Sequence, residues 1–173
     1  MYKIVKLIAT VFIFSATIAL TSCLNANDPI ERTPDLELQE INDAITQIEE
    51  EGYDVDTTAL GVYYVVHDAG IDSLPTIMEG DTCFLEYEGY LLDGTMFDGS
   101  KFLEDDAIWE FVYGDVDLIP GFDNGISLMR KGSRIDLLIP SILAYGPVSY
   151  GLIQPYSPLV FYLKMHDVKP KAN

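Results

Sequence analysis

The chain has 173 residues, enough for one medium-sized domain with additional segments. It carries 28 acidic against 10 basic residues, a net charge of −18. This charge argues against nucleic acid as a partner, because phosphate backbones are bound by clustered basic side chains. It also argues against adsorption on an anionic lipid surface. Solubility is the simplest reason for the acid excess.

The first 23 residues, MYKIVKLIATVFIFSATIALTSC, are typical of a secretory signal. Lys3 and Lys6 precede an apolar run over 7–20, which is shorter than the ~20 residues of a membrane-spanning helix. The final letters, LTSC, resemble a bacterial lipobox. That resemblance implies removal of 1–22 and attachment of lipid, including palmitate-type chains, to Cys23, and several chains make such an anchor durable. The alternative is a plain signal peptide with an incidental cysteine.

Residues 23–33 are polar and contain a proline, so we expect a tether from the lipidated cysteine. The next segment, 34–57, is predicted as an acidic amphipathic helix with its connection. Thr33 is suited to the N-cap and Pro34 to the first helical position. Gly52 is suited to the left-handed residue that follows a helix.

One face of this helix is apolar, because Leu38, Ile41, Ile45 and Ile48 recur at intervals of three and four residues. Such a stripe is buried against the chain's own domain, a second copy or a partner. Packing on the own domain and a helix-mediated dimer are both open expectations.

The cysteines and histidines form no ligand pattern. Cys83 lies in the alternating stretch TCFLEY and is expected to be a buried apolar residue. His67 and His166 are far apart on predicted strands, and no zinc-type cysteine spacing occurs. We expect neither a metal nor a cofactor.

The pattern after residue 53 is mostly that of β-strands, and 58–173 is predicted as the folded domain. Alternating apolar residues predict about five strands, while Phe122, Ile126 and Met129 have helical spacing. This order predicts an α+β fold in which an antiparallel sheet wraps a short central helix. The strands are expected at 61–67, 82–94, 108–114, 133–140 and 158–168, and the helix within 119–132.

The stretch YEGYLLDGTMFDGS, residues 87–100, predicts a β-hairpin around Asp93-Gly94. Asp-Gly between apolar runs favours a type I′ turn, which needs positive φ at both residues. Phe97 and Asp98 follow the turn directly. A large ring beside a carboxylate at that place is either ordinary structure or part of a site.

Three stretches together carry a family resemblance: FLEYEGYLLDGTMFDGS, FVYGDVDLIPGFDNGISLMRKGSRIDLLIP and AYGPVSYGLIQPYSPLVFYL. From about residue 61 to 168 the chain resembles an FKBP-type peptidyl-prolyl cis-trans isomerase. The motifs occur in the family's order and at near-family spacing. The lipobox and the acidic helix resemble envelope-anchored bacterial members.

The resemblance implies a proline pocket lined by aromatic rings, covered by a flap at residues 146–156. The residues that match the family's catalytic positions are Tyr87, Phe97, Asp98, Ile119, Phe122, Tyr145 and Phe161. Those that match further substrate-binding positions are Trp109, Asp117, Leu118 and Ile153.

Individual roles are implied in the same way. Phe122 matches the pocket floor, where many members have tryptophan. The backbone N–H of Ile119 and the hydroxyl of Tyr145 match donors to two substrate carbonyls. Asp98 matches a rim carboxylate held near Tyr87.

Such a site suits the reaction that the resemblance implies. Rotation of an Xaa-Pro bond costs ~18–20 kcal/mol because amide resonance is lost. No bond is made or broken, so an apolar pocket that binds the twisted amide better than the planar one is sufficient.

The sequence also departs from the family pattern. Phe122 is smaller than the usual tryptophan, and Trp109 is larger than the usual phenylalanine. The segment 99–108 is about two residues longer than in compact members and offers Lys101 as only a weak partner for Asp98. Pro120 stands where the family often has a basic residue.

The leading hypothesis is a lipid-anchored isomerase acting on Xaa-Pro bonds of envelope or exported proteins, at the outer membrane. Its pocket would also take macrolide inhibitors. The alternative is a weakly active or inactive chaperone or scaffold that binds proline-containing segments. A third hypothesis makes the acidic helix the functional part, as a docking or dimerisation element.

Overall fold

The computed structural model describes residues 31–104 and 107–172. The predicted signal, the lipobox cysteine and most of the predicted tether lie outside these residues. Within them, none of the helices has both the length and the apolar character needed to span a bilayer.

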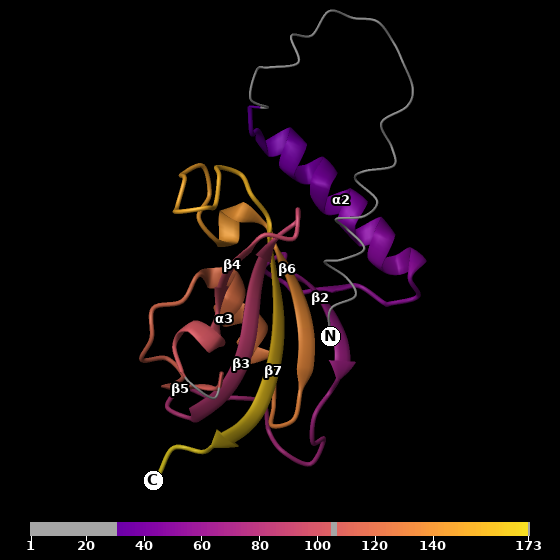
Figure 1. Cartoon of the computed structure of the whole chain (residues 1–173). Helices are drawn as coiled ribbons and strands as arrows, with labels where there is room; N and C mark the ends of the chain where they lie inside the picture. Colours follow the sequence, from indigo (N-terminus) through magenta and orange to yellow (C-terminus); the bar gives the residue numbers. More distant parts are fainter. Residues whose placement is uncertain (1–30, 105–106, 173) are drawn as a thin grey trace, which may run out of the picture.

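The described chain folds into one sheet with helices on both of its faces (Figure 1). In chain order the elements are α2 (Pro34–Glu50), β1 (Asp56–Thr57), β2 (Tyr63–Asp68), β3 (Thr82–Leu91), β4 (Met96–Gly99), the 3₁₀ helix η1 (Ser100–Phe102), β5 (Trp109–Val112), α3 (Pro120–Ser127), β6 (Arg134–Ile139), the 3₁₀ helix η2 (Ser141–Leu143) and β7 (Leu159–Lys169).

The strands are antiparallel and follow the order β1-β2-β6-β7-β3-β4. Strand β5 pairs with the N-terminal half of β3. The long pair β3–β7 runs from Thr82 opposite Lys169 to Leu91 opposite Leu159. The five predicted strands are present, and the sheet has seven strands in the described chain. Of the two strands outside these five, β4 is the second arm of the predicted hairpin, and β1 has only two residues, too few to give a clear alternation.

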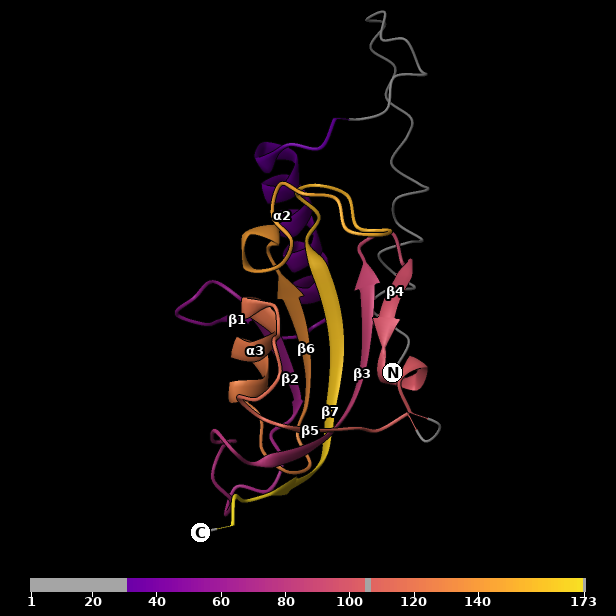
Figure 2. The ribbon, with the colours of Figure 1, turned by 90° about the vertical axis from the view of Figure 1, so that its left-hand side faces the viewer.

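The main core lies between α3 and the sheet face that it covers (Figure 2). Alternate residues of β3, β6 and β7 point to this face, as the twofold period of a strand requires. Helix α3 approaches β6 closely, because a Cβ atom at Gly125 would lie 2.2 Å from Leu137. Cys83 is fully buried here, as predicted. The fully buried apolar members of this core are Val62, Cys83, Leu85, Ile126, Met129, Leu137, Ile139, Leu159 and Met165.

Helix α2 packs on the opposite face of the sheet. Thr33 caps it by accepting a hydrogen bond from Leu36 N (3.2 Å), and Gly52 has φ +88°, both as predicted. The predicted stripe is wrong at one position, because Leu38 is 56% exposed. The helix is rotated so that its first turn buries an acid instead. Its buried residues are Glu37, Ile41, Ala44 and Ile48.

The predicted hairpin joins β3 and β4, but its turn is not type I′. Only Gly94 has positive φ (+88°), whereas Asp93 does not. Leu91 N donates to Thr95 O and Gly94 N donates to Leu91 O, both at 2.9 Å. This is the three-residue loop in which one left-handed residue produces a bulge, and the register shift at Gly89/Tyr90 accompanies it.

Candidate active site

Three aromatic rings form the centre of the candidate site. Tyr87 on β3, Phe122 on α3 and Phe161 on β7 are each at most 6% exposed. The ring centroids of Tyr87 and Phe122 are 5.4 Å apart, and those of Phe122 and Phe161 are 4.8 Å apart, both edge to face. This is the favoured geometry for aromatic pairs, so packing fixes the ring positions.

Two half-buried rings extend the cluster towards solvent. Trp109 lies 5.8 Å from Tyr87, and Phe97 lies 5.5 Å from Phe161, each in an edge-on arrangement. Trp109 is also stacked on Phe111 at 4.1 Å. Strands β5 and β4 therefore each place one half-buried ring at the edge of the buried cluster.

A carboxylate touches the ring cluster through one hydrogen bond. The Tyr87 hydroxyl donates to Asp98 Oδ2 at 3.2 Å, while Asp98 Oδ1 accepts from Gly99 N at 2.8 Å. Burial, and then the Asp98 charge and hydrogen bond, raise the pKa of Tyr87. Tyr87 therefore stays protonated at neutral pH. Lys101 lies 3.5 Å from Glu88, so its ion pair is not with Asp98.

The backbone of Tyr87 is held by a residue that the sequence did not single out. Tyr87 N donates to Ser100 Oγ at 3.1 Å, and Ser100 Oγ donates to Ala107 O at 2.6 Å. Ser100 is 1% exposed. Because the Ser100 hydroxyl bonds two backbone groups at once, it fixes the start of η1 against β3. In the sequence this role is signalled only by a serine directly after Asp-Gly.

The flap, residues 146–156, follows Tyr145 directly in the chain. A cavity of about 370 Å³ lies between the flap and Phe97 at the edge of the ring cluster. Its lining consists of Phe97, Asp98, Tyr145, Tyr150, Gly151, Leu152 and Ile153. Tyr145 and Tyr150 stack at 4.6 Å with ring planes 10° apart. Burial, Tyr150 and Asp98, in that order, raise the pKa of Tyr145, so its hydroxyl is a neutral donor. Tyr150 and Leu152 were not among the predicted site residues.

The entry to α3 supplies a further donor. Ile119 precedes the helix, and its carbonyl accepts from Phe122 N (3.0 Å) and Asp123 N (3.1 Å). Within 31–104 and 107–172, no acceptor is found for the Ile119 N–H. Ile119 and Leu118 are half-buried at the margin of the main core, whereas Asp117 is exposed.

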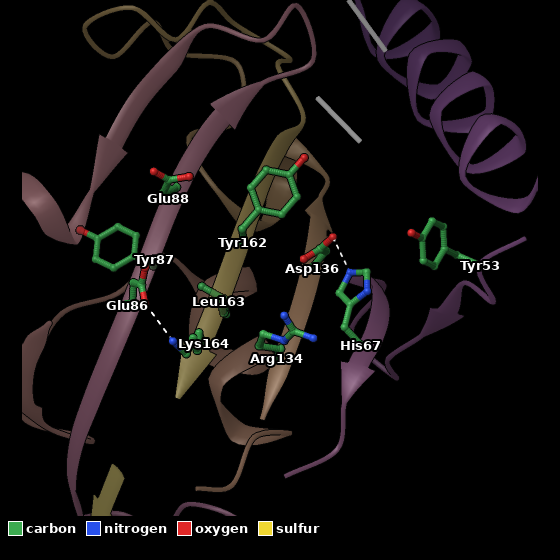
Figure 3. A pocket seen from close by; sticks show the side chains of 10 residues that line it. All are labelled: Tyr53, His67, Glu86, Tyr87, Glu88, Arg134, Asp136, Tyr162, Leu163 and Lys164. Atoms are coloured by element: carbon green, nitrogen blue, oxygen red, sulfur yellow. Dashed lines mark hydrogen bonds and ion pairs between the residues drawn. The ribbon is translucent and has the colours of Figure 1, made fainter. Parts of the chain in front are cut away.

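A second pocket, of about 140 Å³, lies on the other face of the sheet, where residues of β2, β3, β6 and β7 and Tyr53 line it (Figure 3). Its charged side chains are largely paired across neighbouring strands: His67 with Asp136 at 2.7 Å and Lys164 with Glu86 at 3.5 Å. Burial raises the pKa of Asp136, and the contact with His67 opposes this. Cross-strand pairing accounts for this surface. The described ranges contain no group of three metal-ligating side chains.

The structure therefore brings most of the predicted residues together. Ring contacts and one hydrogen bond join Tyr87, Phe97, Asp98, Trp109, Phe122 and Phe161, and the cavity adds Tyr145 and Ile153. Leu118 and Ile119 border the cluster, whereas Asp117 is exposed. The cavity beside the ring cluster has apolar and polar lining side chains, and the neutral hydroxyl of Tyr145 and the carboxylate of Asp98 are among them.

Comparison with known proteins identifies the family. Residues 75–166 match the model of the FKBP-type peptidyl-prolyl cis-trans isomerase family. The chain is 37% identical over 116 residues to the isomerase FkpA of Escherichia coli K12, covering 67% of this chain and 41% of that protein. It is 35% identical over 113 residues to the outer membrane protein MIP of Legionella longbeachae, covering 65% and 46%. The chain thus spans less than half the length of these curated relatives.

Solved structures agree as well. The crystal structure of FkpA from Escherichia coli has a TM-score of 0.65 at 34% identity, covering 80% of this chain and 61% of that one. A peptidyl-prolyl isomerase from Pseudomonas syringae has a TM-score of 0.64 at 25% identity, covering 82% and 100%. The family model spans more than half of the chain, and the fold accords with it: the chain belongs to the FKBP-type peptidyl-prolyl cis-trans isomerases.

Proposed function

We propose that this chain catalyses cis–trans isomerisation of Xaa-Pro bonds, with the proline ring bound between Phe97, Trp109 and Phe122. One observation carries the proposal. The buried rings of Tyr87, Phe122 and Phe161 are bordered by Ile119, whose N–H lacks an acceptor among the described residues, and by a cavity that Phe97 and Tyr145 line.

The physical argument concerns charge separation. A planar amide has resonance and a large dipole, and both are lost as the bond twists through its ~18–20 kcal/mol barrier. An apolar site destabilises the planar amide, with its large dipole, more than it destabilises the twisted amide. The site therefore lowers the barrier by differential binding. Each ~1.36 kcal/mol gained in this way is tenfold in rate.

The residues divide this work. Phe122 forms the floor, and Phe97 and Trp109 form walls that exclude water. Ile119 N–H and the Tyr145 hydroxyl hold the carbonyls on either side of the proline. Asp98 holds the hydroxyl of Tyr87 at 3.2 Å and so keeps the polar rim in place.

The substrates we propose are proline-containing segments of envelope or exported proteins. The signal-like residues 1–22, the lipobox at Cys23 and the polar residues 23–33 support a lipid-anchored form. One relative is an outer membrane protein by name, which supports the same compartment. The same pocket would bind macrolide inhibitors.

The test is acceleration of isomerisation in a series of short Xaa-Pro peptides by the full chain. Asp98→Ala and Tyr145→Phe should reduce kcat/KM. Glu110→Ala, at an exposed position on β5, is the matched control and should leave it unchanged. Equal rates for all four proteins would place the activity elsewhere.

Two features of the site favour a second function, that of a chaperone or scaffold for proline-containing segments. Phe122 is smaller than the tryptophan that the family resemblance leads one to expect at the floor, and the exposed Tyr150 and Leu152 offer apolar surface beside the cavity. Tight binding of Xaa-Pro peptides without acceleration would support this alternative.

A further inference from the structure

Helix α2 reaches the flap through a buried carboxylate. Glu37, in the first turn of α2, is only 8% exposed although it is acidic. Its Oε2 accepts from the Ser141 hydroxyl at 2.7 Å, and its Oε1 accepts from Ser141 N. Burial of a carboxylate is costly unless it is hydrogen-bonded, so these two bonds are what makes this position possible.

Ser141 begins η2, and no side chain of that segment caps it. The first N–H groups of a helical turn lack partners within the turn and favour an acidic acceptor. Glu37 supplies that acceptor from a helix 104 residues away in sequence. The N-terminal helix therefore caps a segment of the isomerase domain.

The capped segment holds the two neighbours of Tyr145 in the chain. Ser141 O accepts hydrogen bonds from Ala144 N and Gly146 N, both at 2.8 Å. These two donors are the neighbours of Tyr145 on either side. Glu37 thus holds Ser141, and Ser141 holds the residues on either side of Tyr145, the proposed substrate donor.

A second contact holds the other end of the flap. Arg32 donates to Tyr156 O at 2.8 Å and makes two bonds to Glu40 in α2, at 2.8 and 2.7 Å. Tyr156 N in turn donates to Gly146 O at 2.9 Å and closes the base of the flap. A bidentate arginine–carboxylate pair is geometrically specific, so Arg32 is well oriented for this contact.

The two views show the consequence in space. Helix α2 and the flap lie at the same end of the sheet in both (Figures 1 and 2). Glu37 and Glu40 are three residues apart and share one face of α2. One helix face therefore binds Ser141, whose carbonyl accepts from Gly146 N at the start of the flap, and Arg32, which donates to Tyr156 O at its end.

We propose that α2 holds the flap over the proline pocket, with Glu37 and Arg32 as positioning residues for the isomerase reaction. This inference rests on the proposed function. A flap that has lost one anchor must be ordered by the substrate, which weakens ground-state and transition-state binding alike. Such a change raises KM and leaves kcat nearly unchanged.

The test compares Glu37→Ala, Glu37→Gln and Arg32→Ala with the control Glu49→Ala, an exposed acid on the same helix. All are measured in the full chain. Glu37→Ala should raise KM for an Xaa-Pro peptide about three- to tenfold, the equivalent of one to two hydrogen bonds. Glu37→Gln should restore most of it, because an amide can accept from Ser141 N and donate to Ser141 Oγ. Arg32→Ala should raise KM, and Glu49→Ala should not.

Amide hydrogen exchange is the second readout, and it does not depend on activity. Glu37→Ala should accelerate exchange of Gly146 and leave Leu163 in β7 protected. Unchanged exchange at Gly146, or faster exchange with an unchanged KM, would overturn the inference. A wild-type chain without activity would overturn the proposed function instead, and hydrogen exchange alone would then decide whether α2 anchors the flap.

Discussion

The hydroxyl of Tyr87 lies 3.2 Å from Asp98 Oδ2, and this single contact joins the buried ring cluster to its polar rim. The ring of Tyr87 also touches Phe122, Phe161 and Trp109. A change at this hydroxyl therefore tests whether the rim matters separately from the rings.

Replacement of Tyr87 by Phe keeps the ring and removes the hydrogen bond. We expect kcat/KM to fall about three- to tenfold and the free energy of unfolding to fall by about 0.5–1.5 kcal/mol. Tyr90→Phe is the matched control, since its hydroxyl donates to Glu88 at 3.0 Å on the opposite face of the sheet. A larger loss of activity in Tyr90→Phe than in Tyr87→Phe would contradict the assignment.

Trp109 is a built-in reporter, because it is the chain's one tryptophan and is the wall of the pocket in the function that we propose. Binding of an Xaa-Pro peptide should shift its fluorescence emission, since a proline ring would displace water from beside the indole. The titration should saturate in the wild type and weaken in Phe97→Ala. Peptide binding seen by another method with no change in emission would place the peptide elsewhere.

Stability should fall at alkaline pH. Burial and Asp123 raise the pKa of Tyr113 to about 12, and that of Tyr87 is raised as well. Because the folded state holds these protons more tightly, their contribution is complete below the unfolded pKa of ~10 and is lost as the pH rises above it. Urea unfolding between pH 8 and about 11.5 should show this decline.

The Tyr113→Phe variant should show a smaller decline, because it removes one of the shifted groups. An identical slope in variant and wild type would assign the pH dependence to other residues.

Helix α3 must lie close to β6 to bring Phe122 to the floor. A Cβ atom at Gly121 would lie 2.2 Å from Ile139 Cγ2, on a branched side chain with little freedom. Gly121→Ala should therefore cost about 1–3 kcal/mol of stability and reduce activity by moving α3.

The control for this change is Gly52→Ala, where no atom lies within 4 Å but φ is +88°. It should cost about 1 kcal/mol through backbone strain and leave kcat unchanged. A wild-type stability for Gly121→Ala would refute the close packing.

The proposed anchor predicts a localisation change. Cys23→Ser removes the lipid acceptor, so the chain should move from the membrane fraction to the soluble fraction, and labelling with radioactive palmitate should be lost. Retention of both membrane association and label in the variant would exclude Cys23 as the site.

Local signals accounted for much of the fold. The ends of α2 followed from Thr33, Pro34 and Gly52, and the alternation of apolar residues located the longer strands. Each of these depends on neighbours in sequence, which is the information that periodicity and capping contain.

Long-range contacts account for the differences. Leu38 is exposed because α2 is rotated to bring Glu37 to Ser141, a contact that no local pattern signals. The Asp93-Gly94 turn has one left-handed residue because the β3–β4 register, not the dipeptide, sets the loop length. Strand β1 forms only through pairing with β2.

The candidate site shows the same division. Its aromatic residues were identified through the family resemblance, and the structure places most of them together. Tyr150 and Ser100 were missed, because a stacked flap residue and a hydroxyl bridging two backbone groups have no distinctive spacing.

Exchange spectroscopy by NMR on an Xaa-Pro peptide with substoichiometric protein tests the central claim most directly, because it reports binding and turnover in one sample. The account predicts cis–trans exchange far faster than the uncatalysed time of ~10–100 s, and its loss when a competing ligand fills the pocket. Peptide binding at the pocket with exchange at the uncatalysed rate would contradict the account and leave a binding scaffold.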